Sequence, residues 1–330
     1  MSGRILVSGA NGFVGSAVVR ALLRHGYPVR ALVRAGSDTT SLDGLAIETA
    51  RGDLLDPPSL ERALQGCTGL FHVAADYRLW ARDPHAIYRA NVRGTHNILA
   101  AARRSSVARI VHTSSVATLG FNHDGTPADE ATPARLADMV GAYKRSKFLS
   151  EALVRRCARA GSDIVIVNPA APVGPRDRKP TPTGRTILDA ARGRMPAYVD
   201  TGLCIVHVDD VAEGHVLAYQ RGQRGRRYVL GGENLSLRAI LQTIAELTHR
   251  HGPWLKLPHA AVLPIAHVAE AWARISGNPP TISVAGVKLS RHRMYFSSRQ
   301  AETELGWYAR PAREALADAI QWFRDNGYLR

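Results

Sequence analysis

The sequence has little that could cross-link the chain or hold a metal ion. Its three cysteines, Cys67, Cys157 and Cys204, lie far apart and form no C-x-x-C pair. This spacing argues against a disulfide framework and against a zinc site. We therefore expect no structural or catalytic metal.

Long apolar runs and an export signal are also missing. The longest apolar run covers the seven residues 260–266, whereas a helix that spans a bilayer needs about 18 or more. An apolar segment begins at Ile5, which leaves no room for a charged n-region, an apolar stretch and a cleavage site. These features predict a cytoplasmic protein.

Lysine is scarce although the chain is basic. The 43 Lys and Arg residues exceed the 28 Asp and Glu residues, which gives a formal net charge of +15. The five lysines are Lys144, Lys147, Lys179, Lys256 and Lys288. The arginines are scattered, without the blocks of cations that are typical of nucleic-acid-binding arms. We therefore expect no nucleic-acid partner.

Short apolar runs alternate with helical patterns through the first half of the chain. With 330 residues, 45% of them hydrophobic, the chain can build one large globular domain or a domain with a smaller companion. The apolar runs are 5–7, 29–33, 70–73, 109–112 and 163–167. Runs buried on both faces and separated by helices predict an α/β fold with a doubly wound parallel sheet of the Rossmann type.

The sequence becomes rich in proline after residue 168. Five prolines fall within residues 169–182, and repeated proline breaks any long helix. We expect residues 1–170 to form the dinucleotide-binding domain, with 205–222 returning to it. Residues 171–330 should form most of a smaller substrate lobe. Helical patterns at 237–250, 260–275 and 312–325 predict that this lobe is mainly helical.

A glycine-rich loop follows the first predicted strand. The residues Gly9, Gly12 and Gly15 have the spacing G-x-x-G-x-x-G and open the first predicted helix. Glycines there permit a tight turn and close approach to a pyrophosphate, and the helix N-terminus offers unpaired N–H groups. The loop therefore predicts a bound dinucleotide.

The residue that meets the adenosine ribose selects between NAD and NADP. An acidic residue after the second strand favours NAD, and an arginine favours the 2′-phosphate of NADP. Here the position is Arg34, followed by Ser37, so we favour NADP and leave NAD open. Asp53 is placed to meet the adenine amino group. The small residues Ala74 and Ala75 would let the cofactor lie against the backbone.

Tyr143 and Lys147 form the sharpest catalytic pattern. Four residues apart on a helix, they share one face and lie about 6 Å apart along the axis. We expect the ammonium to lower the pKa of the phenol from about 10, so that it can exchange a proton with a carbinol or ketone oxygen. Ser115, at the end of the fifth strand, would hold that oxygen beside the nicotinamide.

These motifs together resemble the extended short-chain dehydrogenase/reductases, over nearly the whole chain. The resemblance implies Ser115, Tyr143 and Lys147 as catalytic residues, and Asn91 as support for Lys147 through water. It also implies Pro169 beside the nicotinamide. The complete expected cofactor set is Gly9, Asn11, Gly12, Phe13, Val14, Gly15, Arg34, Ser37, Asp53, Leu54, Ala74, Ala75, Tyr143, Lys147 and Pro169.

Residues 74–80 and 178–184 resemble the bacterial hopanoid-associated sugar epimerases, which are similar to dihydroflavonol 4-reductases. Nucleotide-sugar epimerases like this chain usually carry an arginine four residues before the histidine of the H-V-x-D motif. That histidine is His207, and the arginine's position holds Leu203. A buried diphosphate without a cation is costly, unless Arg185 or the loop 176–179 supplies one.

The reading we favour is an oxidoreductase that transfers hydride at a secondary alcohol or ketone carbon of a bulky, partly apolar substrate, with a role in hopanoid metabolism. One alternative is a sugar or nucleotide-sugar epimerase with tightly bound cofactor. Another is a non-catalytic NADP-binding sensor or scaffold. Substrate contacts are expected from Asp76, Tyr77, Ser115 and Arg176.

Two surface properties stay open at this stage. The helical patterns at 88–104 and after Tyr143 carry small or apolar residues that could form a homodimer contact. The apolar segment 255–275 could lie on a membrane surface. We favour the alternative that this segment is packed core of the small lobe.

Overall fold

The computed structural model describes residues 3–122, 124–278, 280 and 282–329. A seven-stranded sheet has the order β10–β6–β5–β4–β1–β2–β3, and each neighbouring pair is parallel. The strands are β1 (Arg4–Ser8), β2 (Val29–Val33), β3 (Glu48–Arg51), β4 (Cys67–His72), β5 (Arg109–Thr113), β6 (Ile164–Pro169) and β10 (Arg227–Leu230). The predicted doubly wound sheet is confirmed.

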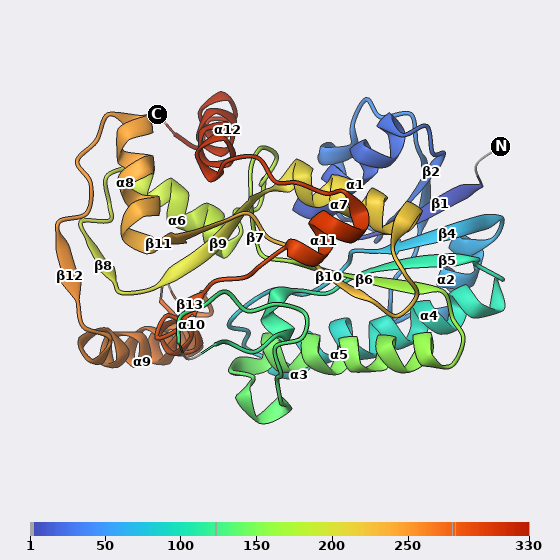
Figure 1. Cartoon of the computed structure of the whole chain (residues 1–330), viewed down its shortest axis with the longest axis horizontal. Helices are drawn as coiled ribbons and strands as arrows, with labels where there is room; N and C mark the ends of the chain where they lie inside the picture. The colour runs from blue at the N-terminus through green and yellow to red at the C-terminus, as the bar shows by residue number, and fades with distance from the viewer. Residues whose placement is uncertain (1–2, 123, 279, 281, 330) are drawn as a thin grey trace.

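Helices cover both faces of this sheet (Figure 1). One face carries α1 (Phe13–Arg24) and α7 (Val208–Arg221), which pack against each other, with α11 (Arg299–Leu305) beside α7. The other face carries α2 (Pro57–Leu64), α4 (Gly94–Arg104) and α5 (Gly141–Arg159). Because both faces are covered, every residue of β2 and β6 is buried. This burial explains the continuous apolar runs in the sequence.

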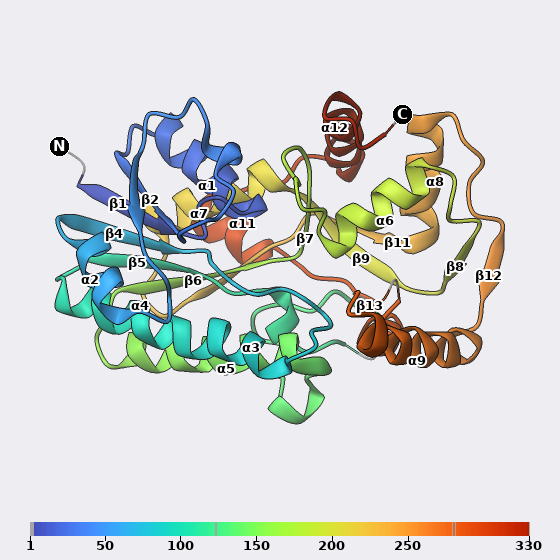
Figure 2. The same cartoon turned by 180° about the vertical axis from the view of Figure 1, so that it is seen from behind.

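The smaller lobe follows directly from the end of β6, and Figure 2 shows it from behind. One sheet joins β11 (Glu233–Ser236), β9 (Gly202–His207), β13 (Arg293–Met294) and β7 (Ala171–Val173), and a second pairs β8 (Ala197–Val199) with β12 (Leu255–Leu257). Its helices are α6 (Pro182–Ala191), α8 (Leu237–Thr248), α9 (His259–Ser276), α10 (Val284–Leu289) and α12 (Ala312–Asp325). The three predicted helices correspond to α8, α9 and α12.

Short helical segments occupy the loops around the carboxyl ends of the large sheet. They are η1 (Thr40–Leu42), α3 (Pro84–Tyr88), the π-helical turn η2 (Arg89–Arg93), and the 3₁₀ turns η3 (Val116–Thr118) and η4 (Leu136–Asp138). In a parallel sheet, ligands bind outside the carboxyl ends of the strands, where the strand order reverses. Here that point lies between β1 and β4.

The structure bears on the expected dimer contact of α4 and on the search for membrane-spanning helices. Ile98 and Ala101 of α4 are fully buried in the protein's own core, so they are not available for the dimer contact that their apolar character suggested. Among the described residues, no helix has both the length and the apolar character to cross a bilayer.

Candidate active site

The glycine loop between β1 and α1 is held by close backbone contacts. A Cβ atom at Gly9, where φ is +69°, would lie 2.7 Å from the Ala74 backbone, and one at Gly15 would overlap the Gly9 carbonyl oxygen. Gly12 is the N-cap of α1 and supplies no side-chain cap, and the first turn holds no acidic residue. The N–H groups of this turn are therefore open to an anion, which fits a dinucleotide pyrophosphate.

The loop after β2 lies against the glycine loop. Asn11 donates its amide to the Asp38 carbonyl oxygen at 2.8 Å. Both the backbone N–H and the hydroxyl of Ser37 donate to the Arg34 carbonyl oxygen, so Ser37 shapes the turn and leaves the Arg34 side chain exposed. The Nε atom of Arg178, from the distant loop after β7, lies 3.9 Å from the Asp38 carboxylate.

The other expected cofactor residues border the same sheet edge. Asp53 uses one carboxylate oxygen to accept the Leu55 N–H at 2.7 Å, and the Leu54 carbonyl accepts the Asn97 amide at 2.8 Å. Ala74 donates its N–H to the Ser8 hydroxyl at 3.3 Å. The remaining positions are Phe13 and Val14, the first two residues of α1, packed against the core, Ala75 exposed after β4, and Pro169 buried at the end of β6.

Ser115 and Tyr143 meet at the carboxyl end of β5. The Ser115 hydroxyl caps η3 by accepting the Ala117 N–H at 3.1 Å, and its side chain hydrogen-bonds with the Tyr143 phenol. Burial raises the pKa of Tyr143 above its usual value, while the bond to Ser115 lowers it by a smaller amount. The phenol is therefore protonated at neutral pH and is suited to donate a proton.

Lys147 does not act on Tyr143 in the way that the sequence suggested. Its ammonium donates to the carbonyl oxygen of Thr113 at 2.8 Å, and it is not among the groups that shift the pKa of Tyr143. Burial lowers the pKa of Lys147 to about 8, and the nearby Glu151 carboxylate opposes that shift. The expected lowering of the pKa of Tyr143 is therefore wrong. Burial raises that pKa, and the Lys147 ammonium points to the Thr113 carbonyl instead of the phenol.

Asn91 ties the loop after β4 to the catalytic helix. Its side chain accepts the Asp76 N–H at 2.7 Å and donates to the Asp76 carbonyl at 2.9 Å and to the Ser146 hydroxyl at 2.9 Å. Ser146 precedes Lys147 on α5. The amide thus holds the backbone on either side of the site, and its support of Lys147 through water stays a prediction.

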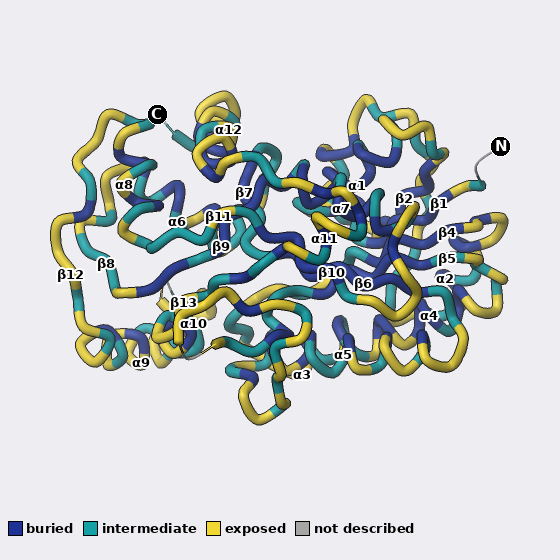
Figure 3. Tube along the Cα trace, viewed as in Figure 1, coloured by how far each residue is buried: buried dark blue, intermediate teal, exposed yellow. Residues whose placement is uncertain are grey.

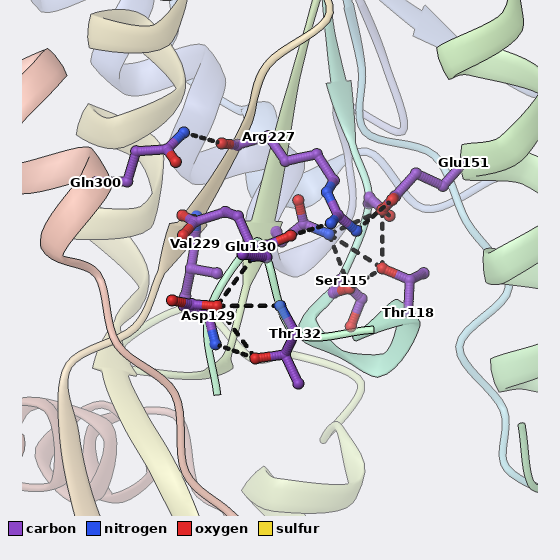
Figure 4. A network of polar contacts seen from close by, with 12 residues as sticks. Ser115, Thr118, Asp129, Glu130, Thr132, Glu151, Arg227, Val229 and Gln300 are labelled. Carbon is purple, nitrogen blue, oxygen red and sulfur yellow. Dashed lines mark hydrogen bonds and ion pairs between the residues drawn. The ribbon is translucent and has the colours of Figure 1, made fainter. Parts of the chain in front are cut away.

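A buried carboxylate behind the site was not identified from the sequence. Glu151, one turn after Lys147, accepts hydrogen bonds from Ser114 at 2.5 Å and from Thr118 and Asn168 at 2.8 Å each. Arg227 of β10 reaches its other oxygen at 3.2 Å, as Figure 4 shows. In the sequence, Glu151 could have been found from its four-residue spacing from Lys147, which places both residues on one helix face.

This network fixes the backbone around Ser115. Asn168 also donates to the Ser115 carbonyl at 3.0 Å. Arg227 donates in turn to the Glu130 carbonyl oxygen, and the Glu130 carboxylate accepts the Val229 N–H at 2.6 Å. Because these partners come from four separated segments, Glu151 couples the loop that carries Ser115 to α5, β6 and β10 (Figure 4).

The expected substrate residues do not all meet. Asp76 pairs with Arg78 at 2.5 Å, and Tyr77 is 42% exposed beside it. Arg176 instead forms an ion pair with Asp209 at the start of α7, and its backbone adopts a φ of +75°. Its charge is therefore used within the protein.

The charges of Asp177 and Arg185, rather than that of Arg176, shift the pKa of Tyr77. Burial raises the pKa of Tyr77, the charge of Asp177 raises it further, and Arg185 opposes both. Burial also raises the pKa of Asp177 itself to about 6. Arg185 is one of the cations that could replace the arginine missing at position 203.

Lys144 is a second buried lysine beside Tyr143. Its ammonium lies 4.6 Å from the centre of the Phe121 ring, which is an attractive cation–π geometry. Burial lowers the pKa of Lys144 to about 8. Because perturbed pKa values cluster at functional sites, the two lysines make this segment a candidate functional site.

Comparison with known proteins agrees with this geometry. The chain is 47% identical, over its full length and 97% of the relative, to a putative dihydroflavonol 4-reductase of Synechocystis sp.. It is 39% identical, over 98% of the chain and 99% of the relative, to sterol demethylase protein B of Methylococcus capsulatus. A third relative is the 4-hydroxy-2-methyl-3-oxo-4-farnesyl-3,4-dihydroquinoline-1-oxide ketoreductase of Stigmatella aurantiaca, 31% identical over 96% of each chain.

Solved structures share the fold over the whole chain. The crystal structure of the protein gox2253 has a TM-score of 0.89 and 50% identity, with 99% of each chain covered. A nucleoside-diphosphate-sugar epimerase from Pseudomonas aeruginosa has a TM-score of 0.82 and 27% identity, again over 99% of each chain.

The model of the NAD dependent epimerase/dehydratase family matches residues 5–231. This stretch runs from the first residues of β1 through the glycine loop and the Tyr143–Lys147 helix to the end of β10. The resemblance seen in the sequence is therefore confirmed. The chain belongs to the NAD dependent epimerase/dehydratase family, the extended short-chain dehydrogenase/reductases, and is an oxidoreductase or epimerase that uses a nicotinamide cofactor.

Proposed function

We propose that the protein is an NADP-dependent reductase of a ketone on a bulky, partly apolar substrate. The observation that carries this proposal is the hydrogen bond between Ser115 and a Tyr143 phenol whose pKa is raised. A phenol that stays protonated can donate to a ketone oxygen, whereas an ionised phenolate cannot. A protonated phenol beside Ser115 is what the reduction of a ketone to a secondary alcohol requires.

Each residue of the site has its own role in the proposed reaction. The nicotinamide supplies hydride to the carbonyl carbon when the cofactor is bound. Ser115 orients the carbonyl oxygen, and Tyr143 donates its proton to that oxygen as the carbon–oxygen double bond becomes a single bond. Lys147, whose ammonium donates to the Thr113 carbonyl at the end of β5, would bind a ribose hydroxyl of the cofactor and add positive charge to the site. The product is the secondary alcohol.

The substrate class follows from the apolar character of the small lobe. Leu203 is partly buried among apolar side chains, and its register partners on β11 and β13 are Leu235 and Met294. A nucleotide diphosphate would find no cation at that position. Relatives named for a flavonol, a sterol and a farnesylated ketone support the same class. A role in hopanoid metabolism stays a prediction.

The charges at the adenosine end support NADP. Arg34 is exposed after β2, and Arg178 approaches the same loop from the other lobe. Two guanidinium groups suit a 2′-phosphate, because they can donate several hydrogen bonds to its oxygens.

Replacing Arg34 with Ala should weaken NADPH binding by about tenfold or more, because a charge-assisted phosphate contact is lost. NADH binding should change little, since NADH has no 2′-phosphate. Titration of the purified protein with each cofactor, followed by nicotinamide fluorescence, measures both constants. Arg51→Ala, an exposed arginine at the end of β3, serves as the control. An equal loss for both cofactors would contradict the assignment.

Glu151→Gln should shift the alkaline limb of the pH–rate profile to lower pH. The carboxylate opposes the lowering of the pKa of Lys147, so removal of its charge lets that pKa fall further. Gln keeps the size of the side chain and part of its hydrogen bonding. The measurement is kcat against pH, together with the melting temperature. Glu61→Gln, which breaks a surface pair with Arg104, is the matched control, and a lower melting temperature with an unmoved limb would show a purely structural role.

An epimerase that returns hydride to the opposite face of the same carbon is the second candidate. Arg185 beside Tyr77 favours it, because it could neutralise a diphosphate from another direction. A panel of ketones and of the corresponding secondary alcohols, incubated with NADPH, separates the candidates. The reductase consumes NADPH in proportion to the alcohol formed, and the epimerase changes configuration with no net consumption.

A further inference from the structure

Helix α9 is apolar on both of its faces. Val262, Ala266 and Ala273 point inward and are buried, and α10 packs against this side. A surface helix normally turns polar residues to water on its outer face. The outer face of α9 departs from that pattern.

Seven apolar residues of α9 form an exposed stripe. They are Ala261, Pro264, Ile265, Val268, Ala271, Trp272 and Ile275. At about 3.6 residues per turn, all seven fall within an arc of about 120°. Ile265 is 57% exposed, Val268 71%, Trp272 67% and Ile275 80%. The expectation that this segment is packed core is therefore wrong for its outer face (Figure 3).

The charges around the stripe are almost all positive. Residues 254–293 contain five Lys and Arg residues and a single acidic residue, Glu270, although two of the cations, Lys256 and Arg293, pair with Asp200 of the preceding segment. The Glu270 carboxylate accepts the Val284 N–H at 2.8 Å, so it faces α10 and lies away from the stripe. Arg274 and His267 flank the stripe on the helix surface, and Lys288 and Arg291 are exposed nearby.

We propose that α9 docks on the surface of an anionic phospholipid membrane. An exposed apolar stripe of this kind marks an interaction surface. The flanking cations would meet lipid phosphates, while Val268, Trp272 and Ile275 enter the boundary between headgroups and acyl chains. Trp272 suits that boundary because its ring is apolar and its N–H is polar. A second copy of the chain would bring the same cations together and is disfavoured by their repulsion.

Helix α10, which packs against α9, also lies against the start of the helix that carries Tyr143. Ala285 of α10 would lie 3.4 Å from a Cβ atom at Gly141, the first residue of the helix that carries Tyr143. His292, just after α10, stacks on Phe121 with ring centres 5.1 Å apart. An apolar substrate could thus enter from the membrane. This last point rests on the proposed reductase function, whereas the docking itself does not.

Co-sedimentation of the full chain with vesicles tests the docking. The vesicles contain phosphatidylcholine alone, or equal parts of phosphatidylcholine and phosphatidylglycerol. The protein should bind the anionic vesicles and bind neutral ones weakly, and added salt should weaken the binding. The triple variant Val268→Ser, Trp272→Gln, Ile275→Ser should lower the partition coefficient by about tenfold or more. Its melting temperature should stay unchanged, because all three side chains face solvent.

Tyr308→Gln is the matched control, since Tyr308 is 75% exposed outside α9 and its loss should leave vesicle binding intact. Absence of binding to anionic vesicles, or equal binding by the triple variant, would overturn the proposal. So would a dimer, seen by light scattering, that the triple variant converts to a monomer without any vesicle binding. The assay contains no substrate or cofactor, so a negative result leaves the reductase proposal standing.

Discussion

Replacing Tyr143 with Phe should lower kcat by about 10²- to 10⁴-fold, because the ketone oxygen loses its proton donor. The ring still fills its place on α5, so the fold and the cofactor loop should be unaffected. Ser115 would keep its bond to the Ala117 N–H and could still orient the substrate. The dissociation constant for NADPH should therefore change by less than about twofold, since the phenolic proton acts on the substrate oxygen.

The comparison needs steady-state rates on an accepted ketone and a direct NADPH titration of the same protein samples. Tyr308→Phe, in an exposed ring far along the chain, controls for the loss of a tyrosine hydroxyl as such. If Tyr143→Phe keeps nearly normal turnover, another group supplies the proton. If NADPH binding collapses together with kcat, the change has disturbed the cofactor site.

Lys147→Met should also lower kcat by about 10²-fold or more, because it removes a buried positive charge at the end of β5, in the same site as Ser115 and Tyr143. Cofactor affinity should fall as well, since the ammonium is placed to bind the ribose. Lys147→Arg restores the charge but not the shape, because a guanidinium is wider than an ammonium and meets the Thr113 carbonyl differently. We expect the Arg variant to recover only a small part of the rate.

The pH dependence of the rate gives a second test of the role of Lys147. The pKa of Lys147 is about 8, so the ammonium is charged below that pH and neutral above it. The rate of the wild-type enzyme should therefore fall as the pH rises through about 8. The phenol of Tyr143 has a raised pKa and stays protonated there. The Arg variant should lose this alkaline limb, and a limb that survives in Lys147→Arg would assign it to another group.

Local patterns were enough to predict five strands of the large sheet and the cofactor loop, whereas β3 and β10 were not among the apolar runs. Strands buried on both faces, such as β2 and β6, must be continuously apolar, and the steric limits at Gly9 and Gly15 require glycine at those positions. The small lobe was harder to predict. Its strands β7, β8 and β12 have three residues each, which is too short for a clear alternating pattern, although α8, α9 and α12 were visible.

The errors in the site arose from contacts that depend on the assembled fold. The spacing of Tyr143 and Lys147 was read correctly, but spacing does not show that Lys147 reaches back to the Thr113 carbonyl. Nor does the sequence show that Arg176 pairs with Asp209 of α7. The partners of Glu151 lie as far away in sequence as Arg227, so a single motif could not reveal them.

The position of α9 shows a different limit. An apolar helical repeat looks the same in sequence whether the helix faces the core or the solvent, so the segment was assigned to the core. The burial of Val262 and Ala266 agrees with that assignment, and the exposure of Trp272 and Ile275 does not. Only the arrangement of the small lobe separates the two faces.

Transfer of deuterium from NADPH labelled at C4 of the nicotinamide tests the central claim most directly. The protein is incubated with the labelled cofactor and an accepted ketone, and the product is examined by mass spectrometry. A reductase of the proposed kind places one deuterium on the carbinol carbon for each NADPH consumed, and Tyr143→Phe slows this transfer. A ketone that takes up no deuterium, together with epimerisation of the corresponding secondary alcohol without net consumption of NADPH, would contradict the account.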